Sequence, residues 1–474
     1  MQRSFPAGFE GPSRRNLLGT LGACALGVAM LAPASLAAPV SLAGGQAEWR
    51  QNYESSPQLS VERSSVPILS QQTYLSTEQA IANYRELAAR GGWGQVPGGQ
   101  TLKLGTRSAA VSALRQRLMA SGDLDQDAAG ASPIFDSFVE AGVKRFQERH
   151  GFLQTGIVSQ QTIAALNVGV EARLRQLELN LVRLKSFTGN LGARYVAANI
   201  PAARVETVDN GVVFSHHQAG VGKIDRQSPV MNTKAIDINF NPFWTVPASI
   251  IRKDLIPKMQ ADANYLNDNH IRVYNKDGQE VPSSAINWHS LEATNYRFRE
   301  DPSTENSLGV VRININNPYG VYMHDTPAKG IFGDDFRFVS SGCMRIQNVR
   351  DYVAWLLKET PGWSRDQIDE VIRSGQRVDA KIVNPVPVYW VYITAWAGPD
   401  GVVQFRDDIY NRDSGGAATA AAGPAAFNAA QPGALPTGSL GPAPRGREIV
   451  PVPLGGDERL SPPLGLDGDV NTLQ

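Results

Sequence analysis

The spacing of apolar residues changes near residue 190, and this change limits the possible folds more than any other feature of the chain. Upstream, apolar residues recur at helical spacing, as in Val111, Leu114 and Leu118. Downstream, residues 194–200 are rich in strand formers, and Asp-Asn-Gly at 209–211 is a hairpin signal. Successive strands with few helices between them favour an antiparallel sheet. The sequence therefore predicts an α+β chain, with helices first and a mixed, mainly antiparallel β domain after them.

Turn residues and composition give finer boundaries. Ser76 and Gln79 form a capping-box pattern, which predicts a helix that runs to residue 89. The last part of the chain is rich in Gly, Pro and Ala and is expected to be disordered. The predicted units are a helical scaffold at 72–100, a three-helix domain at 101–168, a connecting helix at 169–190, the β domain at 191–410 and the tail at 411–474.

Residues 1–38 have the features of a secretory signal peptide. Arg14 and Arg15 precede an apolar stretch, and small residues near Ala38 fit a cleavage site. Paired arginines are typical of the twin-arginine type. Glycines interrupt the apolar stretch, which falls short of the ~20 residues that span a bilayer, so a retained anchor and lipoprotein processing at Cys24 are weaker interpretations. We expect an exported, periplasmic protein without a membrane span after processing, in which residues 39–71 form a linker.

Charge and cysteine content narrow the class of function. The 45 Lys+Arg balance the 45 Asp+Glu, so nothing in the charge favours nucleic acid or an anionic lipid surface as a partner. Of the 2 cysteines, Cys24 leaves with the signal peptide. Cys343 then has no partner for an intramolecular disulfide, so it is either an inert residue or a nucleophile.

Cys343 follows Gly342, and His324 lies nineteen residues upstream. A thiol near its reference pKa of ~8.5 needs a base or a positive neighbour to react near neutral pH. We expect two adjacent strand ends to present Cys343 and His324 to each other, with nearby amides stabilising an oxyanion. A lone cysteine argues against zinc, and we expect neither metal nor cofactor. His216 and His217 are interpreted as exposed strand histidines rather than a metal pair.

Two strings carry a specific resemblance to a known family. Residues 324–332 read HDTPAKGIF, and residues 337–345 read RFVSSGCMR. They resemble the catalytic signature of L,D-transpeptidases, and shorter motifs at 199–201, 221–223 and 241–250 are similar to the large branch with an inserted peptidoglycan-binding domain.

The resemblance implies a fold for each part. The catalytic domain would be a mixed, mainly antiparallel β-sandwich, and residues 101–168 would be a small all-α, three-helix peptidoglycan-binding domain. Residues 249–306 would be a substrate-capping insertion. The helical domain carries Thr155-Gly156 where that family usually has Asp-Gly, so a spacer that no longer binds glycan is the alternative.

The resemblance also implies residue roles. Cys343 would be the nucleophile and His324 the general base and later acid, oriented by the main-chain carbonyl of Asp325. Tyr322 and the amides of Gly342 and Cys343 are candidates for stabilising the oxyanion. The candidates for substrate contact are Arg345, Ser341, Ser340 and Trp244, although Trp244 also fits a core aromatic position.

The implied activity is that of a periplasmic L,D-transpeptidase acting on peptidoglycan stem peptides and glycan. Cys343 would attack the amide before the terminal D-alanine of a tetrapeptide stem, and an amine of a second stem would resolve the thioester into a 3→3 cross-link. The alternatives are an L,D-carboxypeptidase that uses water, an enzyme that anchors proteins to peptidoglycan, and a non-catalytic wall-binding protein. Sortases and papain-like wall peptidases place the histidine differently relative to the cysteine. The sequence does not indicate an oligomeric state.

Overall fold

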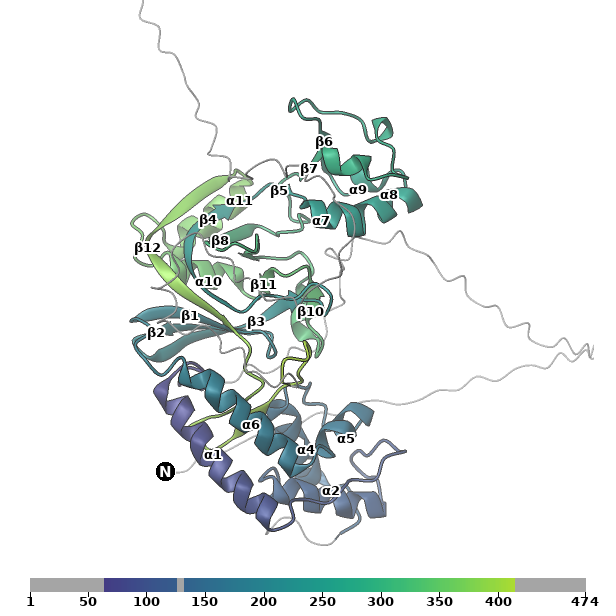
Figure 1. Cartoon of the computed structure of the whole chain (residues 1–474), viewed down its shortest axis with the longest axis vertical. Coiled ribbons are helices and arrows are strands. Elements are labelled where there is room, and N and C mark those ends of the chain that lie inside the picture. Colours follow the sequence, from purple (N-terminus) through teal and green to yellow (C-terminus); the bar gives the residue numbers. More distant parts are fainter. Residues whose placement is uncertain (1–63, 126–131, 414–474) are drawn as a thin grey trace, which may run out of the picture.

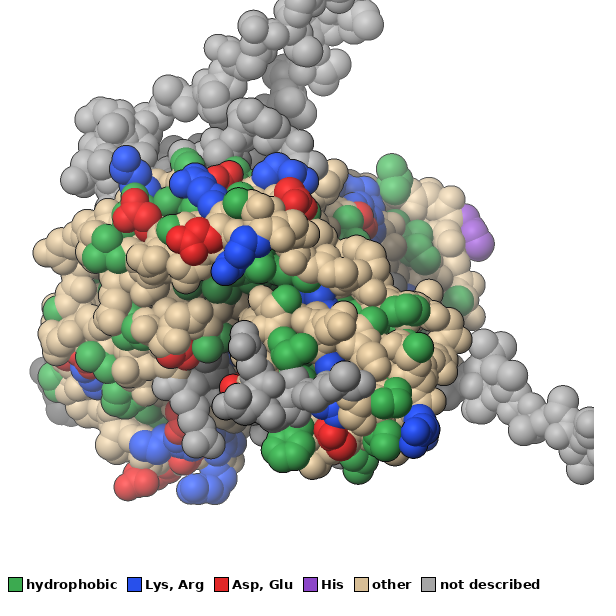
Figure 2. Space-filling view, turned by 90° about the horizontal axis from the view of Figure 1, so that it is seen from below, with side chains coloured by type: hydrophobic (Ala, Val, Ile, Leu, Met, Phe, Trp, Pro, Cys, Tyr) green, Lys and Arg blue, Asp and Glu red, His purple; other side chains and the backbone are tan. Residues whose placement is uncertain are grey.

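The computed structural model describes residues 64–125 and 132–413 (Figure 1). The predicted signal peptide, most of the predicted linker and nearly all of the predicted tail lie outside these residues. Within the described ranges, no helix has the length and apolarity needed to cross a membrane. On the face seen in Figure 2, acidic and basic side chains are interspersed, in keeping with the balanced composition of the chain.

Helices α1 (Gln71–Ala89) and α6 (Val170–Lys185) lie side by side, although a further domain separates them in sequence (Figure 1). Helix α1 begins before the predicted Ser76, because the side chain of Ser70 accepts a hydrogen bond from the Thr73 N–H and caps it. Both helices pack on the hairpin of β13 (Ala395–Ala397) and β14 (Val403–Phe405). Ile68 and Leu69, which the linker prediction included, are buried in the core beside this scaffold.

The inserted helical domain consists, among the described residues, of α2 (Ala109–Ala120), α4 (Ser137–Arg149) and α5 (Gln160–Leu166). Ser108, Asp136 and Ser159 cap the starts of these helices with their side chains. The apolar positions that show helical spacing in the sequence form one core, which includes Val111, Leu114, Leu118, Val139, Val143 and Phe146. The predicted three-helix pattern thus corresponds to a packed unit.

Strand β3 (Val212–Gly222) determines the shape of the β domain because it changes partners along its length. Its first part pairs with β2, and its last residues pair with β11 and β10. The sheet order is β10-β3-β11-β9-β8-β4-β12-β1-β2, and the additional pairing of β3 with β2 closes the sheet on itself. The other strands are β1 (Arg194–Asn199), β2 (Arg204–Asp209), β4 (Met231–Phe240), β8 (Val311–Ile315), β9 (Met323–His324), β10 (Phe338–Ser340), β11 (Met344–Ile346) and β12 (Val378–Val391).

The predicted β-sandwich is not clearly present, because the strands form one closed, barrel-like 9-stranded sheet. The mixed, mainly antiparallel character is confirmed: β1–β12, β3–β10 and β9–β11 are parallel, and the other ladders of this sheet are antiparallel. Helices α10 (Val349–Leu356) and α11 (Arg365–Ser374) contribute apolar side chains to the core of the sheet.

Residues 244–308, here called the lobe, form a separate body beside the closed sheet (Figure 1). Its core runs from Trp244 to Leu308, so it extends slightly beyond the insertion predicted at 249–306. The lobe contains a 3-stranded sheet and several short helices. They are β5 (Trp244–Thr245), β6 (Ile271–Tyr274), β7 (Arg297–Glu300), α7 (Ala248–Ile250), a π-helical turn (Ile251–Leu255), α8 (Ile256–Ala261), α9 (Tyr265–Asp268) and two 3-10 helices (Ser283–Ala285 and Glu292–Asn295).

Candidate active site

The parallel strands β9 and β11 bring the two sequence strings together. Met323 pairs with Met344 and His324 with Arg345, and the Met344 N–H donates to the carbonyl of Tyr322 at 3.0 Å. Side chains alternate along a strand, and both methionines point into the hydrophobic core. Tyr322, His324 and Arg345 therefore lie on the opposite face, with the rings of Tyr322 and His324 5.7 Å apart. Cys343 packs against the edge of the same core as the methionines and contacts the Tyr322 hydroxyl.

The turn before Cys343 is held by two serines. Ser340 Oγ accepts from the Gly342 N–H at 3.1 Å and donates to the Cys343 carbonyl at 2.6 Å, and Ser228 Oγ donates to the Gly342 carbonyl at 2.9 Å. Gly342 has φ 111, and a Cβ there would lie 3.3 Å from Val321 Cγ1, so the position favours glycine. Because the Gly342 N–H already bonds to Ser340, the expected oxyanion donors reduce to the Cys343 N–H and the Tyr322 hydroxyl.

The Cys343 thiol is half-buried and lies against Tyr322. Burial raises the pKa of this thiol to about 11, while the main chain and hydroxyl of Tyr322 and the charges of Arg312 and Arg345 act in the opposite direction. The thiol is therefore protonated at neutral pH in this structure and needs a base when it reacts.

His324 is the candidate base. Its Nδ1 lies 2.5 Å from the main-chain carbonyl of Asp325, which can only accept a hydrogen bond, so Nδ1 carries the proton and Nε2 is left as the acceptor. Burial lowers the pKa of His324 to about 3, and the charges of Arg345 and Arg312 add to this effect. In residues 64–125 and 132–413, no direct hydrogen bond joins the imidazole to the Cys343 thiol.

The buried carboxylate of Asp325 fixes the segment that carries His324. It forms an ion pair with Lys329 and accepts a hydrogen bond from the Val310 N–H at 3.1 Å. The Asp325 N–H donates to the Val311 carbonyl at 2.9 Å. Its side chain occupies the space beside Gly309, where a Cβ would approach Asp325 Oδ2 to 2.4 Å.

Tyr322 connects the thiol to the lobe. Its hydroxyl accepts from Trp244 Nε1 at 2.9 Å, and the Arg312 guanidinium lies 4.4 Å from its ring centroid. Burial raises the pKa of Tyr322, so the hydroxyl keeps its proton and can donate it to the sulfur or to a developing oxyanion.

The structure places three of the four predicted substrate contacts away from the surface. Trp244 is buried in the lobe core and supports Tyr322, Ser340 supports the cysteine turn, and Arg345 is only 2% exposed. Their role in substrate contact stays a prediction, and the charge of Arg345 lowers the pKa values of both Cys343 and His324. Ser341 is exposed beside Cys343 and stays a candidate for substrate contact.

Arg226 links Ser341 to the lobe. Its guanidinium donates to Ser341 Oγ at 3.0 Å and to both carboxylate oxygens of Asp254 at 2.5 and 2.8 Å. Sequence reasoning missed Arg226, Ser228 and Arg312, although the motif at 221–223 immediately precedes the first two. Arg312 lies opposite His324 in the β8–β9 ladder. Only this pairing shows that the charge of Arg312 acts on His324 and Cys343.

His216 and His217 are held by hydrogen bonds within the fold. His217 is 2% exposed and bonds to the Gln347 carbonyl and Ser215 Oγ, both at 2.8 Å, so its interpretation as an exposed histidine is wrong. His216 is half-buried, and its Nε2 bonds to the Ser64 carbonyl at 3.1 Å. These two side chains bond to different partners because neighbours on a strand face opposite sides.

Comparison with known proteins gives two domain matches. Residues 193–371 match the L,D-transpeptidase catalytic domain family YkuD, and residues 107–166 match the family described as "Putative peptidoglycan binding domain". A Haemophilus influenzae protein named "Putative L,D-transpeptidase" is 31% identical over 260 residues, which are 54% of this chain and 52% of that protein. The chain therefore spans about half the length of this curated relative.

Solved structures of L,D-transpeptidases also align with the chain. One from Mycobacterium smegmatis is 14% identical and covers 42% of this chain and 58% of its own, with a TM-score of 0.22. One from Stackebrandtia nassauensis is 12% identical and covers 63% of this chain and 96% of its own, with a TM-score of 0.23.

Proposed function

We propose that this chain, whose residues 193–371 match the YkuD L,D-transpeptidase catalytic domain and whose residues 107–166 match a peptidoglycan-binding domain, remodels peptidoglycan in the periplasm by cysteine acyl transfer. The observation that supports the proposal is the pairing of β9 with β11, which brings the segment of Cys343 alongside that of Tyr322 and His324, whose lowered pKa keeps the imidazole neutral. These are the groups that a thiol-based acyl transfer needs: a nucleophile, a base and an oxyanion donor.

In the first step, Cys343 Sγ attacks the carbonyl carbon of the third residue of a tetrapeptide stem. The thiol proton moves to His324 Nε2, and the carbonyl oxygen becomes an oxyanion that accepts hydrogen bonds from the Cys343 N–H and the Tyr322 hydroxyl. The carbon–nitrogen bond then breaks, and the imidazolium returns the proton to the leaving amine of D-alanine. The product is a thioester on Cys343.

In the second step, the side-chain amine of another stem attacks the thioester. The amine gives a proton to His324, the carbon–sulfur bond breaks, and the thiolate of Cys343 recovers that proton. The result is a 3→3 cross-link and a regenerated enzyme. Water in place of the amine would yield a tripeptide, which is the carboxypeptidase alternative.

The helical domain supports the choice of peptidoglycan as substrate. It is inserted between α1 and α6, and α6 leads directly into the closed sheet at β1. We infer that this domain holds glycan strands near the catalytic domain, and that the predicted twin-arginine signal delivers the chain to the periplasm.

The decisive experiment compares the wild-type protein with Cys343→Ala on disaccharide tetrapeptide. The wild type should release D-alanine and form a dimer with a 3→3 link, detected by mass spectrometry, whereas Cys343→Ala should do neither while keeping its circular dichroism spectrum. Family resemblance also predicts a carbapenem adduct on Cys343 of the wild type and none on the variant. Release of D-alanine by Cys343→Ala would refute the mechanism, and tripeptide without dimer would identify a carboxypeptidase.

A further inference from the structure

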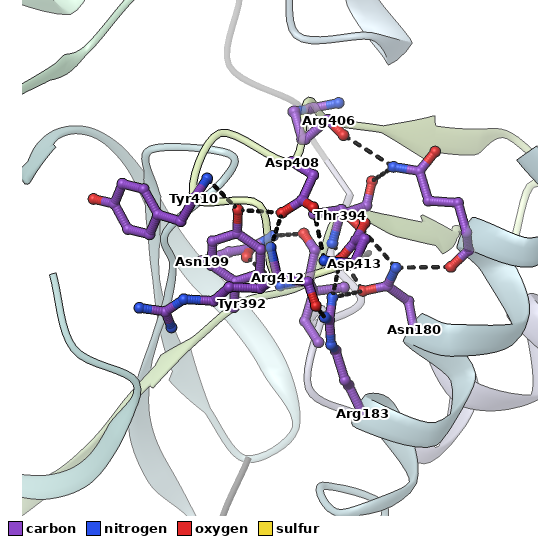
Figure 3. A network of polar contacts seen from close by, with 12 residues as sticks. Asn180, Arg183, Asn199, Tyr392, Thr394, Arg406, Asp408, Tyr410, Arg412 and Asp413 are labelled. Atoms are coloured by element: carbon purple, nitrogen blue, oxygen red, sulfur yellow. Dashed lines mark hydrogen bonds and ion pairs between the residues drawn. The ribbon is translucent and has the colours of Figure 1, made fainter. Parts of the chain in front are cut away.

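Residues 405–413, here called the strap, follow the scaffold hairpin and lie beyond the matched catalytic range of 193–371. Figure 3 shows the polar contacts that surround the strap. The end of the strap is fixed to α6. Asp413 accepts hydrogen bonds from Arg183 and Thr394, both at 2.6 Å, and Arg183 also donates to the Arg412 carbonyl at 3.0 Å. Asn180 holds Thr394 in turn, with bonds of 2.7 and 2.9 Å. Arg183, Asn180 and Thr394 are buried, where hydrogen bonds are stronger than in water, so they hold the strap in one position.

Asp408 folds the strap into a compact turn. Its carboxylate accepts from the N–H groups of Arg412 and Asp413 and from the Tyr392 hydroxyl, each at 2.7 Å. The Tyr392 hydroxyl accepts from the Tyr410 N–H at 2.8 Å, and the two tyrosine rings stack with centroids 5.7 Å apart. The turn therefore fixes the position of the Tyr410 ring, which extends away from the α6 anchor in Figure 3.

The Tyr410 hydroxyl reaches the segment next to the cysteine turn. It donates to the Gly222 carbonyl at 2.5 Å and accepts from the Ser228 N–H at 3.3 Å. Ser228 Oγ accepts from the Gly222 N–H at 3.0 Å and donates to the Gly342 carbonyl at 2.9 Å. One residue, Ser228, thus separates Tyr410 from the peptide bond between Gly342 and Cys343.

This peptide bond carries the amide that is expected to stabilise the oxyanion. A peptide unit is planar and trans, so its carbonyl and its N–H point in opposite directions. When Ser228 holds the Gly342 carbonyl, the direction of the Cys343 N–H is fixed as well. The 222–228 segment is closed by the bond from the Gly222 N–H to Ser228 Oγ, and it is so tight that a Cβ at Gly222 would lie 2.3 Å from the Arg226 carbonyl oxygen. An oxyanion donor is effective only when its direction is set in advance.

We propose that Tyr410 is a positioning residue for acyl transfer: through Ser228 it sets the direction of the Cys343 N–H. The inference rests on the proposed acyl chemistry at Cys343. It makes the strap, anchored on α6, part of the catalytic unit. A substitution in the strap then affects the step that forms an oxyanion and spares reactions of the thiol that form none.

The test compares two reactions of Cys343 in the full-length protein. p-Nitrophenyl acetate acylates the thiol through a tetrahedral oxyanion, whereas iodoacetamide alkylates it by displacement of iodide without an oxyanion. Tyr410→Phe should lower the acylation rate about 10-fold or more, and leave the alkylation rate within about twofold. The ratio of the two rates measures oxyanion stabilisation and does not depend on whether the natural substrate is peptidoglycan.

Tyr195→Phe is the matched control, because it also removes a buried hydroxyl that donates to a main-chain carbonyl, that of Leu69 at 2.8 Å. For Tyr195→Phe, the ratio of acylation rate to alkylation rate should equal that of the wild type. Ser228→Ala cuts the same link without changing the strap and should lower the ratio as Tyr410→Phe does. The inference fails if Tyr410→Phe and Ser228→Ala keep the wild-type ratio, or if Tyr195→Phe lowers it equally. If Tyr410→Phe lowers the ratio but the wild-type protein releases no D-alanine, the inference stands and only the proposed substrate is rejected.

Discussion

Replacing Gly309 by alanine should disable His324 without touching it. Gly309 has φ 58, and its added Cβ would lie 2.4 Å from Asp325 Oδ2. The Asp325 carboxylate has little room to retreat, because it is buried, forms an ion pair with Lys329 and accepts from the Val310 N–H. The whole residue must therefore shift, and its carbonyl is the group that holds His324 Nδ1.

The size of the effect follows from two terms. A non-glycine residue in the left-handed region costs about 1–2 kcal/mol. Disturbing a hydrogen bond to a buried charged group costs about 1.5–3 kcal/mol. Gly309→Ala should therefore lower the free energy of unfolding by about 2.5–5 kcal/mol. A displacement of the imidazole by ~1 Å should lower kcat about 100-fold.

Gly320→Ala provides the control for backbone strain. Gly320 has φ 67, and a Cβ added there would have no other atom within 4 Å, so only the first term, about 1–2 kcal/mol, applies. Urea unfolding followed by tryptophan fluorescence gives both stabilities, and D-alanine release gives both rates. Equal losses of stability and equal rates for the two variants would refute the argument that Gly309 makes room for Asp325.

Two further predictions concern acid stability and the lobe. The pKa values of His217 and His324 are lowered by burial to about 4 and about 3, so the unfolded chain takes up protons near pH 6.5 before the folded chain does, and stability falls as the pH drops below that value. At pH ~5 each histidine should lower the free energy of unfolding by about 2 kcal/mol. Urea unfolding of His217→Phe should therefore depend less on pH than that of the wild type, and parallel plots of stability against pH would contradict this. Arg226→Gln removes the ion pair with Asp254 and should raise the KM for tetrapeptide about fivefold, while iodoacetamide alkylation stays unchanged; an unchanged KM would contradict a role of the lobe in binding.

Element types were predictable from the sequence, whereas the closure of the sheet was not. Apolar spacing located the helices of the inserted domain, and Asp-Asn-Gly located the strand pair around Asn210, because these signals are local. Closure depends on β3, whose two ends pair with strands far apart in the chain. Neither the spacing of apolar residues nor the composition encodes which strands pair. The sequence therefore does not distinguish two stacked sheets from one closed sheet.

The candidate site was predictable to a similar extent. Cys343, His324 and Asp325 lie in short strings whose order indicates their chemistry. Tyr410 bonds to Gly222 across 188 positions of the sequence, and no local signal marks such a contact. Trp244 and Arg345 have side chains suited to substrate contact, and the sequence did not reveal that both are buried.

The charges of Arg312 and Arg345 favour the charged form of Cys343 but disfavour the charged form of His324. A positive neighbour favours a thiolate, as the sequence argument required, and Arg312 and Arg345 both lower the pKa of Cys343. The same charges lower the pKa of His324, because they disfavour an imidazolium. A resting thiolate–imidazolium pair is therefore disfavoured on the histidine side, and burial disfavours it on the cysteine side as well. In the mechanism that we propose, proton transfer to His324 therefore accompanies the attack on the carbonyl, as the negative charge moves from sulfur to the oxyanion beside Tyr322.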